Sequence, residues 1–142
     1  MNKWDRRFLD LAEHISKWSK DPSTQVGAVI VDNKRRIVGL GYNGFPAGVE
    51  DTEERYFDRE VKYSMVVHAE VNAILNAVRE VKDCSLYVSP LFTCNECAKL
   101  IIQSGISRVV AIDERTDRWN SKHEVSKKMF SEAGVEYRIY SR

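Results

Sequence analysis

The sequence predicts an α/β domain built around a mixed β-sheet. Three observations support this fold class: helical and strand-like segments alternate along most of the chain, two strand-like segments meet across a short polar turn, and the composition is that of a globular protein. The chain has 142 residues, of which 43% are hydrophobic and 30% are charged. This length suits one hydrophobic core, and no internal repeat or linker divides the chain, so we expect a single domain over residues 1–142.

An amphipathic helix is predicted at the start of the chain. Apolar residues recur at spacings of three and four from Trp4 to Trp18, which is the pattern of one helix face. Both tryptophans are therefore expected to pack in the core. Asp21 and Pro22 then break the helical pattern.

A β-hairpin and a long excursion are predicted next. Residues 25–31 and 36–42 are typical of strands, and the polar residues 32–35 between them are typical of a turn. The glycine-rich segment 41–48 is expected to be a shaped loop. Residues 49–63 hold five acidic and three basic side chains, which indicates an exposed excursion with room for a short helix.

Helices and strands alternate over the rest of the chain. The predicted elements are, in order, a helix over 68–79, a strand over 85–89, a helix over 96–104, a strand over 108–113, a helix that ends at Ala133 and a strand over 135–140. The first of these helices is indicated by apolar residues at helical spacing between Val71 and Val78. Residues 114–120 form a polar connection to the last helix, which Gly134 ends in the C′ position. This alternation favours parallel pairing of the later strands.

Charge and composition exclude several functional classes. Twenty-two basic and 21 acidic residues leave a formal net charge of +1, so nothing indicates a polyanionic partner. The N-terminus is charged from its third residue and lacks the apolar stretch of a signal peptide, and no apolar run approaches the roughly 20 residues of a membrane span. The odd number of cysteines, three, argues against a fully paired disulfide framework. We therefore expect a soluble, cytoplasmic protein without a nucleic-acid or membrane partner.

His68, Cys94 and Cys97 are the candidate metal ligands. Zinc is commonly bound by thiolate and imidazole, and a catalytic zinc site uses three protein ligands and leaves a fourth position for water. One histidine and one Cys-x-x-Cys pair supply three ligands, which predicts an open catalytic site rather than a closed structural one. The other cysteine and histidines lie at no obvious ligand spacing and are expected to take no part: Cys84, His14 and His123.

Glu70 is the candidate for proton transfer. It lies two residues after His68, about 200° around the predicted helix, so it would lie near the metal without binding it. From there it could take a proton from metal-activated water and pass it on. Cys94 and Cys97 lie where a strand gives way to a helix, whose N-terminal dipole favours thiolate over thiol. Glu96, between them, is interpreted as a favourable charge on the first helical turn.

A wider resemblance supports this assignment. His-x-Glu alone often arises by chance and Cys-x-x-Cys also occurs in redox pairs, but together they follow the signature of zinc nucleobase deaminases. The chain resembles the deoxycytidylate (dCMP) deaminases along nearly its whole length, in four segments: 20–28, 41–46, 68–75 and 94–106. The second and fourth segments are the most specific, because free-cytidine and tRNA deaminases share only the bare zinc motif.

The resemblance implies a fold, an activity and a cofactor. The implied fold is the cytidine deaminase-like three-layer fold, a five-stranded mixed sheet with helices on both faces, formed here by one zinc-dependent deaminase domain. The implied reaction is the hydrolytic deamination of dCMP to dUMP and ammonia, which supplies dUMP for thymidylate synthesis. In this assignment His68, Cys94 and Cys97 bind one Zn²⁺ ion, and Glu70 is the catalytic proton shuttle.

The resemblance also implies substrate contacts, regulation and assembly. By position, Asn43 matches the residue that contacts the sugar, the backbone of Ala69 matches the contact with the pyrimidine, and Ser23 is a further candidate. The family's enzymes are typically hexamers that dCTP activates and that dTTP inhibits together with Mg²⁺, so a homo-oligomer is expected. The loop that starts at Tyr42 resembles the segment that binds effectors, which makes Tyr42 and Gly44 candidate effector contacts.

Three positions depart from the family pattern. Thr93 stands where a proline precedes the first zinc cysteine, and Pro90 can supply the rigidity instead. Val49 stands where several relatives have a cysteine, in some of them a ligand of a second, structural zinc, so a single zinc ion is expected. Arg115 stands where some relatives have an active-site tyrosine, and it could either clamp the 5′-phosphate or form an exposed salt bridge.

Two other functions fit parts of the sequence. The same zinc chemistry could act on a cytosine or adenine base flipped out of a nucleic acid, but the net charge of +1 and the lack of a basic stripe disfavour this. The other is a non-enzymatic zinc module, which Glu70 disfavours because a purely structural site has no use for that carboxyl group.

Overall fold

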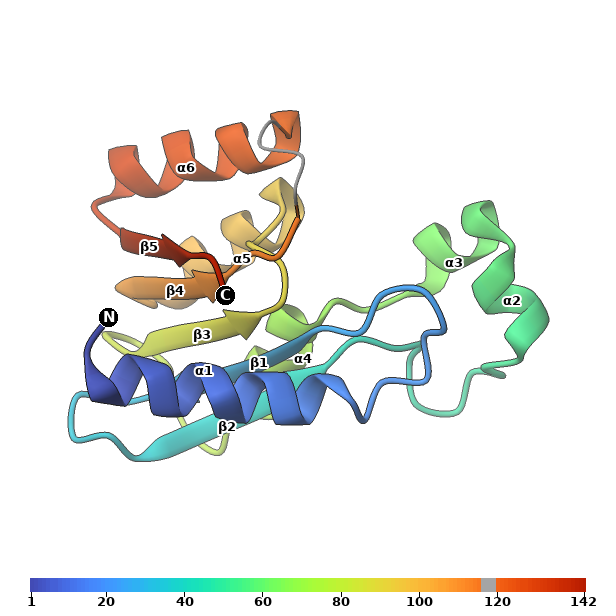
Figure 1. The fold of residues 1–142 in the computed structure, drawn as a ribbon, viewed down its shortest axis with the longest axis horizontal. Helices are drawn as coiled ribbons and strands as arrows, with labels where there is room; N and C mark the ends of the chain where they lie inside the picture. Colours follow the sequence, from blue (N-terminus) through green and yellow to red (C-terminus); the bar gives the residue numbers. More distant parts are fainter. Residues whose placement is uncertain (116–119) are drawn as a thin grey trace.

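A five-stranded β-sheet with helices on both sides forms the body of the molecule (Figure 1). The computed structural model describes residues 1–115 and 120–142, so residues 116–119 of the predicted polar connection lie outside the described residues. The strands are β1 (Gly27–Val31), β2 (Ile37–Tyr42), β3 (Ser85–Ser89), β4 (Arg108–Ile112) and β5 (Glu136–Tyr140). The helices are α1 (Lys3–Ser16), α2 (Glu53–Phe57), α3 (Arg59–Met65), α4 (Ala69–Leu75), α5 (Asn95–Ser104) and α6 (Ser121–Ala133).

The strands follow the order β2-β1-β3-β4-β5 across the sheet. β1 pairs antiparallel with both β2 and β3, whereas β3 with β4 and β4 with β5 pair in parallel. The predicted hairpin and the parallel pairing of the later strands are therefore confirmed. Gly27, the first residue of β1, pairs with Tyr42 at the end of β2 and with Ser89 at the end of β3. The loops that leave β2 and β3 consequently start at the same edge of the sheet.

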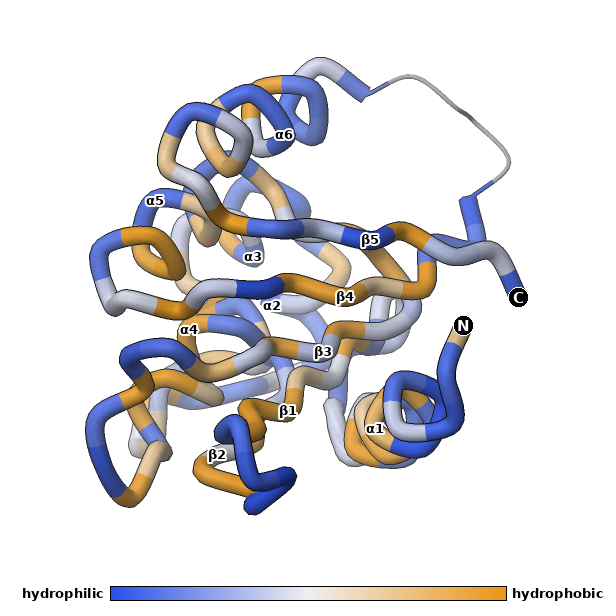
Figure 2. The backbone as a smooth tube through the Cα atoms, turned by 90° about the vertical axis from the view of Figure 1, so that its left-hand side faces the viewer, coloured by the Kyte–Doolittle hydropathy of each residue, from blue (hydrophilic) through white to orange (hydrophobic). Residues whose placement is uncertain are grey.

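Helices cover both faces of the sheet, as the three-layer fold requires (Figure 2). α1 lies on one face, and α4, α5 and α6 lie on the other. β1 is buried along its whole length, because Ala28 and Ile30 face the core under α4 and α5 while Val29 and Val31 face the core under α1. No helix in the described part of the chain has both the length and the apolar character needed to cross a membrane.

α4 packs unusually close to the hairpin. A Cβ atom on Gly39 would lie 2.6 Å from the carbonyl oxygen of Ala73, and one on Gly41 would lie 2.4 Å from the Ala73 backbone nitrogen. Real Cβ atoms do not approach other atoms so closely, so both positions of β2 require glycine. Because these two glycines lack side chains, α4 can pack at a short distance from β2.

Of the apolar residues that predicted α4, Val71 and Ile74 are partly buried against the core, whereas Leu75 and Val78 are exposed. The helix faces the sheet with Ala69 and Ala73, which are fully buried, whereas Leu75 is 73% exposed. α4 also ends at Leu75, four residues earlier than predicted, and Val78 beyond it is 85% exposed. The helical spacing was a correct signal for the element, but small side chains form its buried face because the packing distance is short.

The prediction for Trp18 is wrong. α1 ends at Ser16, and a turn in which the Ser19 N–H donates to the Ser16 carbonyl carries Trp18 out to solvent, where it is 52% exposed. Its ring meets that of Tyr42 edge-on at 6.2 Å. Trp4 is half-buried in the stack that its ring forms with Phe8, so the expectation of packing holds in part for this residue.

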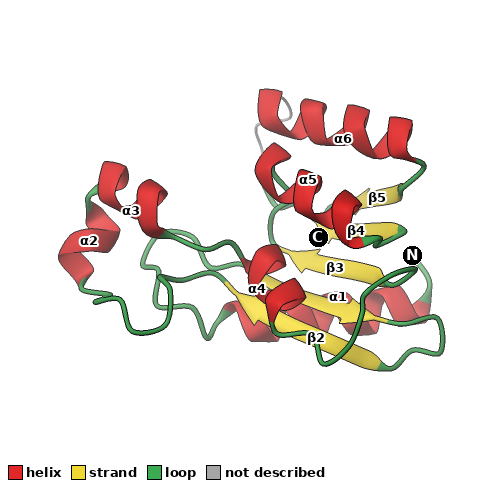
Figure 3. Ribbon diagram, turned by 180° about the vertical axis from the view of Figure 1, so that it is seen from behind, coloured by secondary structure: helices red, strands yellow, loops and turns green. Residues whose placement is uncertain are grey.

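The predicted excursion is an arm that stands away from the sheet and contains two short helices, α2 and α3 (Figure 3). The Thr52 side chain caps the N-terminus of α2, and the Asp58 side chain caps the N-terminus of α3. The arm is fastened to the loop after β2 at two points. Gly44 and Val67 form an isolated antiparallel bridge, and the rings of Phe45 and Tyr56 stack at 4.4 Å.

A buried ionic cluster ties α1 to the sheet. Asp5 is almost fully buried and accepts two hydrogen bonds from Arg108, at 2.9 and 2.8 Å, and one from the Tyr87 hydroxyl at 2.9 Å. Burial alone would raise the pKa of the Asp5 carboxyl, but the bonds from Arg108 and Tyr87 together outweigh it and lower that pKa. Arg108 also pairs with the more exposed Glu136 at 3.0 Å.

Replacing Asp5 should therefore cost much more stability than replacing Glu136. We expect Asp5→Asn to lower the free energy of unfolding by about 2–4 kcal/mol, because it leaves Arg108 without its buried partner. Glu136→Gln should change it by less than about 1 kcal/mol, since that pair is solvated. Urea unfolding at neutral pH measures both values, and equal effects of the two substitutions would contradict this interpretation.

The same pair sets a pH dependence. A carboxyl whose pKa is lowered by folding stabilises the protein above its unfolded pKa of about 3.9, and the stabilisation is lost as the pH falls through the folded value. The difference between the wild type and Asp5→Asn should thus shrink in acid.

Candidate active site

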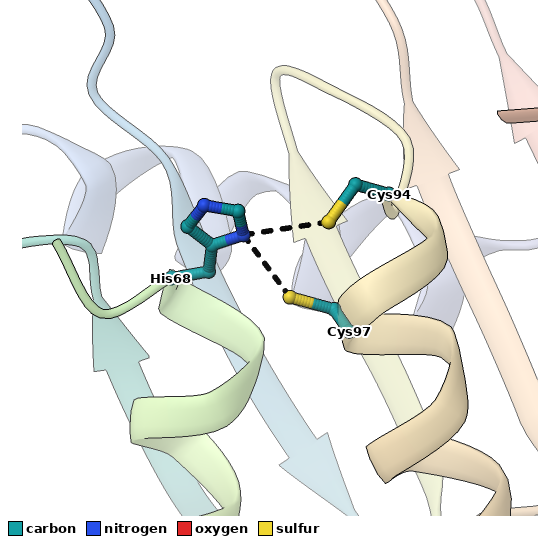
Figure 4. A group of neighbouring side chains, drawn as sticks. All are labelled: His68, Cys94 and Cys97. Carbon is teal, nitrogen blue, oxygen red and sulfur yellow. Dashed lines mark hydrogen bonds between the residues drawn. The ribbon is translucent and has the colours of Figure 1, made fainter. Parts of the chain in front are cut away.

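Three side chains converge where helices α4 and α5 begin (Figure 4). His68 is the N-cap residue of α4 and Cys94 is the N-cap residue of α5, and neither side chain caps its own helix. Nδ1 of His68 lies 3.2 Å from Sγ of Cys97 and 3.5 Å from Sγ of Cys94. One ligand atom from each residue lies within 4.8 Å of the other two. The structure therefore brings the three predicted metal ligands together.

The donor atoms and their spacing fit a zinc ion. With bonds of about 2.3 Å to sulfur and 2.0–2.1 Å to nitrogen, donors of a tetrahedral site lie about 3.5–3.8 Å apart, close to the separations seen here. Hydrogen bonding from Cys97, helped by His68, lowers the pKa of Cys94 to about 3 against the effect of burial. The bond to Cys94 in turn raises the pKa of Cys97, so a metal ion would have to displace that proton.

Glu70 lies beside this cluster without joining it. Among the described residues the metal-binding group consists of His68, Cys94 and Cys97, and Glu70 lines the same cavity as His68 and Cys94. Glu70 is only 5% exposed, and burial raises the pKa of its carboxyl because the charged form is poorly solvated. A carboxyl with a raised pKa next to a metal site is suited to accept and return a proton.

A cavity of about 320 Å³ opens beside these residues, at the lower end of the range of about 300–1,000 Å³ that is usual for ligand sites. Its wall combines the metal-site residues with segments from the loop before β1, the end of β2, α3 and the start of α6. The cavity lies at the sheet edge where β2 and β3 end, which is where open α/β sheets bind ligands.

Asn43 is held rigidly in the cavity wall. Its Oδ1 accepts a hydrogen bond of 2.9 Å from the Val26 N–H, and its Nδ2 donates to the Thr24 carbonyl at 2.8 Å and to Asp21 at 3.4 Å. The residue is 6% exposed and borders the cavity. These hydrogen bonds hold the amide group in one orientation. Asn43 is therefore a rigid polar residue in the same cavity wall as His68 and Glu70.

Lys62 is a cavity residue that sequence reasoning missed. Its Nζ lies 2.7 Å from Oδ2 of Asp21 and donates to the Ser23 hydroxyl at 2.9 Å. The Asp21 side chain is fully buried, and although burial would raise its pKa, Lys62 and the N–H groups of Ser23 and Thr24 together lower it. Lys62 belongs to α3, so this ion pair joins the arm to the loop that orients Asn43. No local pattern links residues 21 and 62, which is why the pair was not predicted.

Arg115 and His123 form another part of the wall. Nε of Arg115 donates to Asp113 at 2.9 Å, its Nη2 also bonds Asp113, and the guanidinium contacts His123. Of the two alternatives for Arg115, a salt bridge is therefore present, although it is partly buried rather than exposed. His123 lines the cavity and packs edge-on against Phe92 at 5.5 Å, and it does not belong to the group of His68, Cys94 and Cys97. Burial, with the nearby Arg115 charge, lowers the pKa of His123.

The remaining predicted site residues differ in where they lie. Ala69 is buried and lines the cavity. Ser23 is exposed, and its hydroxyl accepts a hydrogen bond from Lys62, which lines the cavity. Tyr42 ends β2 with its ring against Trp18, away from the metal-site residues, and Gly44 forms the bridge to the arm. Neither of the two candidate effector contacts is among the residues that line the cavity.

Comparison with known proteins agrees with this geometry. The family model described as "Cytidine and deoxycytidylate deaminase zinc-binding region" matches residues 2–113. An uncharacterized deaminase of the luxG 3′ region of Aliivibrio fischeri is 49% identical over 139 residues, covering 96% of this chain and 92% of the relative. The deoxycytidylate deaminase of Homo sapiens is 44% identical over 148 residues, covering 97% of this chain and 80% of the relative.

Solved structures share the fold. The apo crystal structure of dCMP deaminase from the cyanophage S-TIM5 superimposes with a TM-score of 0.74 at 24% identity and covers both chains completely. A structure from work on tRNA:A34 deaminases gives a TM-score of 0.56 at 22% identity, covering 96% of this chain and 91% of the other. These likenesses confirm the predicted cytidine deaminase-like architecture, and with the family match and the close relatives they show that the chain belongs to the cytidine and deoxycytidylate deaminase family.

Proposed function

We propose that this protein is a single-domain, zinc-dependent hydrolase that converts dCMP to dUMP and ammonia. One observation carries the proposal: a set of three metal ligands, His68, Cys94 and Cys97, with the buried Glu70 beside it in the wall of a cavity of about 320 Å³. A purely structural zinc site would need neither the carboxyl nor the cavity. Relatives named deoxycytidylate deaminase, with about 44% identity over nearly the whole chain, support dCMP as the substrate.

Glu70 is proposed as the catalytic residue. Zinc, when bound by the three ligands, would activate a water molecule for attack on the base. The Glu70 carboxylate would accept one proton from the attacking water, hold it on its carboxyl oxygen and give it to the pyrimidine ring. It would then carry a second proton, from the newly added hydroxyl group, to the departing amine, which leaves as ammonia. The raised pKa of Glu70 favours this cycle, because a buried carboxyl holds a proton more readily than a solvated one and releases it as the product forms.

Four residues are proposed to bind the substrate. The rigid amide of Asn43 would contact the sugar, and the backbone of Ala69 would contact the pyrimidine where α4 begins. Ser23 and Arg115 would lie near the phosphate end. The Arg115 charge is already matched by Asp113, so its contribution there would be to shape the wall rather than to supply net charge.

Regulation, assembly and location are proposed from the resemblance. dCTP would activate and dTTP with Mg²⁺ would inhibit the enzyme, which would feed dUMP into thymidylate synthesis in the cytoplasm. The proposed effector site would use Tyr42, whose ring is exposed beside Trp18, and Gly44 in the same loop. A homo-oligomer, a hexamer in the resembling enzymes, is supported by exposed apolar side chains on α4 and α5, including Leu75 and Leu100.

The same zinc chemistry on a base within a nucleic acid is the alternative. The near-neutral net charge of +1 disfavours it, because binding of a polymer recruits many phosphate contacts.

An assay of four substrates tests the proposed activity. Zinc-loaded protein should release ammonia from dCMP faster than from deoxycytidine, dCTP or a cytosine-bearing oligonucleotide. Glu70→Gln should retain zinc and lose about 10²–10⁴-fold in kcat, because it cannot transfer protons. Release from the oligonucleotide alone would refute dCMP as the substrate, and full activity of Glu70→Gln would refute its role as proton shuttle.

Metal content tests the single zinc site. The purified wild type should contain one zinc ion per chain, measured by inductively coupled plasma mass spectrometry. Cys97→Ser should lose most of it, since one of three protein ligands is weakened. The matched control is Cys84→Ser, because Cys84 is also a buried free cysteine but does not belong to the metal-binding group. A second zinc ion in the wild type, or zinc loss in Cys84→Ser equal to that in Cys97→Ser, would contradict the assignment.

A further inference from the structure

Three lysine and arginine side chains line the cavity among the described residues, and two of them are paired with a carboxylate. The Lys62 ammonium is matched by Asp21 at 2.7 Å, and the Arg115 guanidinium is matched by Asp113. Lys122 also lines the cavity, but its ammonium forms no hydrogen bond or ion pair with any residue in the described ranges 1–115 and 120–142. Within the described part of the chain, Lys122 is therefore the lysine or arginine of the cavity wall whose charge is not matched by a carboxylate.

The start of α6 fixes the backbone of Lys122. The Asn120 side chain caps the helix and accepts hydrogen bonds from the N–H groups of Lys122, at 3.0 Å, and His123, at 3.3 Å. The next residue, His123, is buried against Phe92 and anchors this first turn to the core. The Lys122 side chain extends from this fixed turn and borders the cavity. It lies close enough to His68 for its positive charge to disfavour protonation of the imidazole, which acts to lower the pKa of His68. The positive end of the α6 dipole adds to the same potential.

This cation lies where the charge of a nucleotide needs one. If the pyrimidine reaches His68 and Glu70 and the sugar lies beside Asn43, the 5′-phosphate points from the sugar toward the rim of the cavity. A phosphate dianion moved out of bulk water needs a matching cation to offset its lost hydration. An ammonium group without a protein partner gains more from the phosphate than one already paired, such as that of Lys62.

We propose that Lys122 binds the 5′-phosphate and thereby makes the enzyme select a nucleoside monophosphate over the free nucleoside. The inference rests on the proposed function and adds the specificity-determining residue to it. Lysine acts here as a flexible point charge, so Lys122 can follow the phosphate without a fixed bidentate geometry.

The test replaces Lys122 in the full, zinc-loaded chain. Lys122→Gln should lower the ratio of kcat/KM for dCMP to kcat/KM for deoxycytidine by about 10- to 100-fold, the range expected when one charge-assisted hydrogen bond is lost. Lys122→Arg should restore most of the ratio, because it restores the charge. Lys128→Gln is the matched control, since Lys128 is an exposed lysine of the same helix away from the cavity, and it should leave the ratio within about twofold of the wild type.

A binding measurement separates this proposal from the proposed activity. Calorimetry with dUMP and deoxyuridine should show a preference for dUMP that Lys122→Gln reduces by a similar factor, and this readout requires no turnover. Absence of dCMP turnover in the wild type would refute the proposed activity, whereas the binding preference would still test Lys122. An unchanged ratio in Lys122→Gln would overturn the inference. An equal loss of kcat/KM with both substrates is one such result, because it leaves the ratio unchanged and indicates an effect on the metal site rather than on the phosphate.

Discussion

The close approach of α4 to the β-hairpin is the constraint on which the site depends. Gly39 and Gly41 leave room for the backbone of Ala73, and a single added methyl group at either glycine would meet that backbone at 2.6 Å or less. This packing sets the position of the first turn of α4, and with it His68 and Glu70. The imidazole then reaches the two cysteines at the start of α5, while the carboxyl is buried in the wall of the cavity. Larger residues in β2 would move both groups together.

Around this fixed centre the protein balances its charges in pairs. Asp21 is buried as a carboxylate only because Lys62 and backbone N–H groups bind it, and through these bonds it orients the loop that holds Asn43. Arg115 of the cavity wall forms a second such pair with Asp113. These pairs make the described wall rigid at little net charge, so the Lys122 ammonium and the metal site would contribute most to the field that a ligand experiences there. The arm contributes to the site chiefly through Lys62.

The sequence was sufficient for features that depend on neighbours along the chain. Every strand, the main helices and the grouping of His68 with the cysteines follow from local spacing, and the resemblance supplied the sheet architecture. Features that depend on tertiary packing were missed. Helical periodicity continues to Trp18 although the helix ends at Ser16, and the Lys62–Asp21 pair spans 41 positions without a local signal. His123 enters the cavity wall only because α6 packs against Phe92.

The central claim is that the metal site has three protein ligands and one open position. Zinc K-edge X-ray absorption on the purified, zinc-loaded protein measures this directly. We expect two sulfur atoms at about 2.3 Å, one imidazole nitrogen at about 2.0 Å and one further light atom from solvent. A shell of three or more sulfur atoms, or of two sulfurs with two imidazoles, would indicate a site closed by the protein and would contradict the account.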